Sequence, residues 1–132
     1  VRVPEGWART ERQNGARFAD KFNAVDIDLS AVAAPPSVAS VKNGQAAALL
    51  KTGHAVKIKT VKNVKLSTGP AILIVYESNS GPNPVTNKQH RLENNRYLMY
   101  RNGKLATLDL AAPLGADNVD QWRLIVQSFH WN

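Results

Sequence analysis

The chain has 132 residues, of which 43% are hydrophobic, and this fits one folded domain over residues 1–132. Its longest apolar run, Ala71–Tyr76, has the length of a strand, well short of the ~20 apolar residues of a membrane-spanning helix. The absence of cysteine excludes disulfides, thiolate metal sites and cysteine nucleophiles. A net charge of +7, with basic residues spread along the chain, favours anionic partners without choosing among them.

The N-terminal part predicts strands. Asn14–Gly15 is a hairpin signal between two short extended pieces. The stretch that follows has the period of a half-buried strand, with apolar residues alternating with polar ones: Val25, Ile27 and Leu29 against Asp26, Asp28 and Ser30.

A helix is expected next, in the stretch "VASVKNGQAAALLK". Ser37 is a suitable N-cap, and Gly53 suits the position just beyond the C-terminal end. Asn43–Gly44 weakens the middle of this helix, by about 1 kcal/mol relative to alanine at the glycine alone.

Four further strands are predicted in "HAVKIKTVKNVKLS", "GPAILIVYES", "RLENNRYLMYR" and "KLATLDLAAP". The second is nearly all apolar, as in a strand covered on both faces. Asn102–Gly103 predicts a hairpin between the last two. Residues 78–91 are expected to form a long exposed loop.

The C-terminal stretch predicts an amphipathic helix that closes the core. Asp117 is its expected cap, and its apolar stripe consists of Val119, Trp122, Ile125, Val126 and Phe129. The expected fold is therefore α+β: a central antiparallel sheet of about six strands flanked by helices, one after the N-terminal strands and one at the C-terminus.

The sequence has no recognisable catalytic or metal-binding signature. His54, His90 and His130 have no partner at metal-ligand spacing, so we expect no metal and no cofactor. Asp26 and Asp28 share a strand face, but alternation predicts that they point to water or to a neighbouring basic residue.

Two groups of basic residues are candidate binding sites. The first lies in one strand region, where Lys57 and Lys59 share a face and a kink or bulge near Val61 would bring Lys62 and Lys65 alongside. A lysine-rich edge strand that resists aggregation is the simpler interpretation. The second combines the long loop with the hairpin arm after it: Lys88, His90, Arg91, Arg96, Tyr97, Tyr100 and Arg101.

Several stretches resemble small exported or lipid-anchored actinobacterial proteins with a PsbP-like fold, relatives of the LpqN-type lipoproteins. They are "VPEGWARTER", "FADKFNAVDIDL", the helix after "PPSVAS", "GPAILIVYESNSGPNPVTNK" and "RYLMYRNGKLATLDLAAPLGADNVDQWRLIVQSFHW". The resemblance implies a sheet flanked by helices, in an extracytoplasmic domain tethered by a lipid or transmembrane anchor outside this chain. It implies non-enzymatic roles and supplies no catalytic residues.

The first hypothesis is accordingly a non-enzymatic binding or accessory module of the bacterial cell envelope, contacting a protein or an anionic envelope component. A basic nucleic-acid-binding domain is a second and less favoured hypothesis. A third is a small hydrolase or transferase, which requires a pocket where ionisable side chains converge near Asp26, Asp28, His90 or His130.

Overall fold

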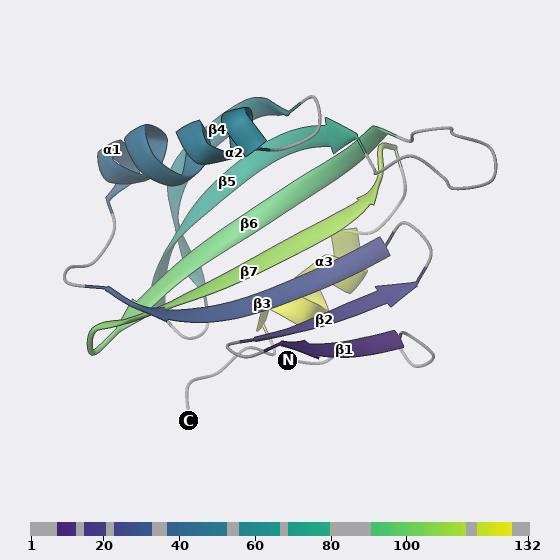
Figure 1. The fold of residues 1–132 in the computed structure, drawn as a ribbon, viewed down its shortest axis with the longest axis horizontal. Helices are drawn as coiled ribbons and strands as arrows, with labels where there is room; N and C mark the ends of the chain where they lie inside the picture. Colours follow the sequence, from purple (N-terminus) through teal and green to yellow (C-terminus); the bar gives the residue numbers. More distant parts are fainter. Residues whose placement is uncertain are drawn as a thin grey trace.

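The computed structural model describes residues 8–12, 15–20, 23–32, 37–52, 56–66, 69–79, 91–115 and 119–127. Within these ranges one antiparallel sheet has the strand order β1-β2-β3-β7-β6-β5-β4 (Figure 1). Its strands are β1 Ala8–Arg12, β2 Gly15–Asp20, β3 Asn23–Ala31, β4 Lys57–Leu66, β5 Gly69–Asn79, β6 Arg91–Arg101 and β7 Lys104–Pro113. The sheet has seven strands, in line with the expectation of about six, and both arms of the N-terminal hairpin belong to it.

Helices lie on both faces of the sheet (Figure 1). One face carries a helical segment made of α1 (Val38–Val41), the π-helical turn η1 (Lys42–Ala46) and α2 (Ala47–Thr52). The other face carries α3 (Val119–Gln127). The predicted α+β class and both predicted helices are confirmed, and among the described residues no helix is long and apolar enough to cross a membrane.

Local signals fix the first helix. The Ser40 N–H donates to Ser37 Oγ at 3.1 Å and the Ser37 N–H donates to Ser40 Oγ at 2.8 Å, so the predicted N-cap is part of a capping box. The expected weak point at Asn43–Gly44 coincides with η1, where the helix widens. The expected C-terminal Gly53 lies outside the described residues, as does Asp117 before α3.

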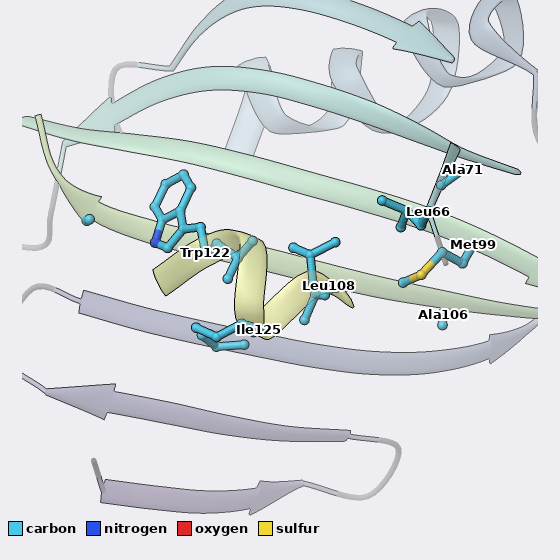
Figure 2. Close-up of a cluster of buried hydrophobic side chains, with 11 residues drawn as sticks. Leu66, Ala71, Met99, Ala106, Leu108, Trp122 and Ile125 are labelled. Carbon is cyan, nitrogen blue, oxygen red and sulfur yellow. The ribbon is translucent and has the colours of Figure 1, made fainter. Parts of the chain in front are cut away.

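The core consists of two clusters, one on each face. The cluster under α3 holds Trp122, Ile125 and Val126 of that helix against Leu108 and Met99 of the sheet. Figure 2 shows Trp122, Ile125 and Leu108 around α3, with Met99 farther along the sheet. The cluster under α1 and α2 centres on Ile74 and Leu98. β5 contributes to both clusters, which confirms that this strand is covered on both faces.

The β6–β7 connection is the predicted two-residue turn. Asn102 and Gly103 have φ angles of 51° and 80°, the positive values that a type I′ hairpin requires at both positions. Arg101 pairs with Lys104 directly across it. The long loop expected over 78–91 is shorter within the described chain, since Ser78, Asn79 and Arg91 belong to strands; residues 80–90 lie outside the description.

Gly15 begins β2 and lies directly opposite Asp28 of β3. A Cβ at Gly15 would lie 1.8 Å from the Ile27 carbonyl oxygen and 2.7 Å from Asp28 Oδ1. We expect Gly15→Ala to lower the free energy of unfolding by about 1–3 kcal/mol, because the strands must separate to admit the methyl group. Gly44→Ala is the matched control: nothing lies within 4 Å of its Cβ, so helix propensity should raise stability by about 0.5–1 kcal/mol. Urea denaturation measures both, and equal effects of the two substitutions would contradict this strand pairing.

Candidate functional site

Part of the sheet face that carries α1 and α2 has no described helix over it. In Figure 1 the helical segment follows β4 and β5, whereas β3, β2 and the adjoining length of β7 are uncovered. Strand register brings polar side chains from five strands onto this area. We call these residues the open polar face: Arg17, Asp26, Asp28, Tyr76, Asn94, Arg96, Thr107 and Asp109.

Asp109 is the centre of the open polar face. Only 7% of this residue is exposed, and its Oδ2 accepts hydrogen bonds from Arg96 Nε at 2.8 Å and from the Tyr76 hydroxyl. The Arg96 guanidinium carbon also lies 5.9 Å from the centre of the Tyr76 ring, within cation–π range. One carboxylate, one guanidinium and one phenol thus form a connected network that joins β5, β6 and β7.

Burial has the largest effect on the pKa of each ionisable group in this network. It raises the pKa of Asp109, and the charge of Asp26 raises it further, while Arg96 and the Tyr76 hydrogen bond oppose the shift. Burial and the Asp109 charge also raise the pKa of Tyr76, so the phenol stays protonated and donates. Burial alone would lower the pKa of Arg96, but Asp109 and Tyr76 outweigh it and the pKa rises, so the guanidinium keeps its charge.

Further polar contacts flank the network. Arg17 Nη1 lies 2.7 Å from Asp26 Oδ2, which confirms the expectation that Asp26 faces a basic neighbour. Asp26 is in turn directly opposite Asp109 in the β3–β7 register. On the other side, the Ser78 hydroxyl donates to Asn94 Oδ1 at 2.9 Å. The polar groups are therefore held in fixed positions by one another.

The open polar face lines a recess of about 370 Å³, a volume within the range of small-ligand sites. Its walls carry two guanidinium groups, from Arg17 and Arg96, and three carboxylates, from Asp26, Asp28 and Asp109. The recess is thus locally acidic in a protein whose net charge is +7. Such a surface suits a partner that offers hydrogen-bond donors or a cation.

Two solved structures are similar to this one over almost the whole chain. The protein of unknown function PA94 from Pseudomonas aeruginosa superposes with a TM-score of 0.68 at 13% identity, covering 100% of this chain and 90% of PA94. Cyanobacterial PsbP, CyanoP, from Synechocystis sp. PCC 6803 superposes with a TM-score of 0.63 at 11% identity, covering 96% of this chain and 79% of CyanoP. The fold is PsbP-like. No protein-family model matches the sequence, and no curated protein is significantly similar to it.

On the PsbP-like sheet, the residues of the predicted loop-and-hairpin site do not share one surface. Alternation along β6 turns Arg96 and Tyr100 to the face of α1, and Arg91, Tyr97 and Arg101 to the face of α3. Arg96 is largely buried in the Asp109 network and Arg101 is exposed beside the turn. Lys88 and His90 lie outside the described residues, as do His54 and His130.

The lysine-rich strand is β4, and it is an edge strand as the simpler interpretation requires. Lys59 Nζ lies 2.9 Å from Glu77 Oε2, while Arg91 Nε lies 3.3 Å from Oε1 of the same carboxylate. The hydrogen bond from Lys59 lowers the pKa of Glu77, which keeps this carboxylate ionised. Lys59 and Tyr97 also line a cavity of about 430 Å³ beside Trp122 of α3.

Sequence reasoning named Arg96 but missed its partners Asp109 and Tyr76. Asp109 stands among apolar neighbours in "KLATLDLAAP", where it reads as an ordinary outward-facing residue. Counting outward from the Asn102–Gly103 turn would have paired it with Arg96. Within the described residues no group of three or more histidine, cysteine or acidic side chains could hold a metal ion.

Proposed function

We propose that this domain is a non-enzymatic binding module that receives a protein partner on the open polar face. The observation that carries the proposal is the recess of about 370 Å³ whose hydrogen-bonding groups are already held in place by the Arg96–Asp109–Tyr76 network. Preorganised polar groups lose little freedom when a partner binds, so they favour affinity and specificity. The acidic walls favour a basic segment of that partner.

The module is proposed to work outside the cytoplasm, at the cell envelope, held by a lipid or transmembrane anchor that is not in this sequence. The resemblance of the sequence to exported actinobacterial proteins supports this location. The PsbP-like fold is compatible with it and does not select it.

A substitution that fills the recess tests the proposal. Thr107 lies on the recess floor, half-buried, so Thr107→Phe should occupy the space without removing any group of the network. A column of wild-type protein should retain envelope proteins, and a Thr107→Phe column should retain at least tenfold less of them. A tenfold loss corresponds to about 1.4 kcal/mol of binding free energy. Mass spectrometry of the eluates measures the change.

Leu124→Phe is the matched control, because Leu124 is 61% exposed on α3 and lies outside the recess. The Leu124→Phe column should retain the same proteins as wild type. Retention of cytosolic proteins alone, or unchanged retention by Thr107→Phe, would contradict the proposal.

A small hydrolase is the second candidate, because its structural condition is met: ionisable groups converge in a recess that includes Asp26 and Asp28. Burial raises the pKa of Asp109, as in many catalytic acids. The bonds from Arg96 and Tyr76 to one carboxylate oxygen favour a structural role for Asp109 over proton transfer. Turnover of ester or glycoside substrates that Asp109→Asn abolishes in a folded protein would replace the binding proposal.

A further inference from the structure

We infer that the edge of the domain formed by β4 and the helical segment α1–η1–α2 docks on an anionic lipid surface. This inference is independent of the open polar face, which lies on other strands. The docking edge is defined by six lysines and one exposed leucine: Lys42, Lys51, Lys57, Lys59, Lys62, Lys65 and Leu50.

The distribution of acidic residues makes this edge distinctive. Between Leu29 and Tyr76 the sequence has six lysines, no arginine and no acidic residue, so this segment carries nearly all of the net charge of +7. The basic residues are spread along the chain, but the acidic ones are not. The net charge is therefore concentrated in the sequence between Leu29 and Tyr76, and Glu77, which pairs with Lys59, is the first acidic residue after it.

The fold keeps these lysines together at the end of the sheet. β4 is the outermost strand, and the helical segment lies beside it (Figure 1). Lys42 and Leu50 of the helices line one shallow cavity with Lys59 and Thr60 of β4, so the two elements form a continuous surface. All six lysines are exposed.

An irregularity in β4 places Lys57 and Lys62 on the α3 face of the sheet, whereas the helical segment α1–η1–α2 lies on the other face. The register with β5 shifts between Ile58 and Thr60, so Lys62 pairs with Leu73 and lies on the same side of the sheet as Lys57, which pairs with Glu77. In a regular strand Lys57 and Lys62 would point to opposite faces. A bulge near Val61 was expected to bring Lys62 and Lys65 onto the face of Lys57. The shift does so for Lys62, whereas Lys65 lies on the opposite face of the sheet.

The composition of the docking edge favours lipid over nucleic acid. Lysine is a compact charge that interacts with many headgroups at once, so each lysine near an anionic membrane adds to the affinity. Nucleic-acid surfaces usually add arginine or aromatic side chains for base contacts, and the described part of this edge exposes neither. It exposes instead Leu50, at 56%, which can enter the interfacial layer of a bilayer.

Vesicle co-sedimentation tests the inference. We expect the protein to bind phosphatidylcholine vesicles that contain about one-third phosphatidylglycerol, and not vesicles of phosphatidylcholine alone. Binding should weaken strongly between about 0.05 M and about 0.3 M NaCl because salt screens the lysines. Lys62→Glu with Lys65→Glu should reduce the affinity at low salt by at least about tenfold.

Matched variants separate the docking edge from net charge alone. Arg101→Glu with Lys104→Glu makes the same change in charge at the exposed β6–β7 turn and should bind nearly as wild type. Leu50→Ala should bind the anionic vesicles several-fold more weakly than wild type. Leu124→Ala should keep the wild-type affinity, because Leu124 is exposed on α3 and not on the docking edge. Thr107→Phe should bind vesicles as wild type does, because Thr107 lies on the open polar face. Loss of vesicle binding and loss of the protein partner can therefore be told apart.

Three results would overturn the inference. They are absence of binding to the anionic vesicles, equal losses in the two double charge variants, and displacement of the protein from vesicles by an equal concentration of duplex DNA phosphate. The last result would identify the edge as a nucleic-acid surface.

Discussion

Trp122→Ala is expected to lower the free energy of unfolding by about 3–5 kcal/mol, the range for a buried tryptophan. Trp122 is 8% exposed and packs in the cluster that contains Ile125 and Leu108 (Figure 2). The indole also borders the cavity of about 430 Å³ beside α3.

Urea denaturation followed by circular dichroism measures this effect. Leu124→Ala on the same helix is the control, because Leu124 is 61% exposed and its removal should change the free energy of unfolding by no more than about 0.5 kcal/mol. Equal stability of the two variants would mean that α3 does not close the core.

Elements defined by short-range signals were predictable from the sequence. The Ser37 cap, the Asn102–Gly103 turn and the apolar stripe of α3 each depend on residues within a few positions of one another. Such signals fix local backbone geometry or one buried face, and the structure confirms each of them in the described residues. The same reasoning reached the antiparallel sheet and the two helices.

The candidate site was less accessible because it depends on strand pairing. Neighbours along β6 were grouped into one patch, but successive residues of a strand face opposite sides, so Arg96 and Tyr97 never share a surface. The partner Asp109 could have been found, since a two-residue turn at Asn102–Gly103 fixes the register of β6 and β7. Tyr76 could not, because β5 ends at Asn79 and β6 begins only at Arg91, and so long a separation does not fix the register from the sequence.

The two proposed surfaces lie on different strands and would bind different partners. The open polar face extends over β2, β3, β5, β6 and β7 with acidic walls, and the docking edge on β4 and the helices carries the lysines. A domain held against an anionic bilayer by its edge would leave the open polar face accessible to a protein partner.

The network beneath that face gives the second large expected effect. Arg96→Met should lower the free energy of unfolding at pH 7 by about 3–5 kcal/mol, because it leaves the carboxylate of Asp109 buried without its cation. The Arg96→Met/Asp109→Asn double variant should return to within about 1 kcal/mol of wild type. Its amide still accepts the Tyr76 hydrogen bond and no unpaired charge remains.

The pH dependence separates this explanation from a simple loss of packing. The pKa of Asp109 is raised in the folded protein from an ordinary value of 3.8, so the folded state holds the proton to higher pH than the unfolded chain, and stability falls as pH rises through that interval. Arg96 opposes the shift, so its removal raises this pKa further and widens the interval. The deficit of Arg96→Met should therefore be largest at neutral pH and shrink toward pH 4, whereas the double variant should show no such trend. A deficit that stays constant across this range would mean that Arg96 stabilises the protein through packing, and not by compensating the charge of Asp109.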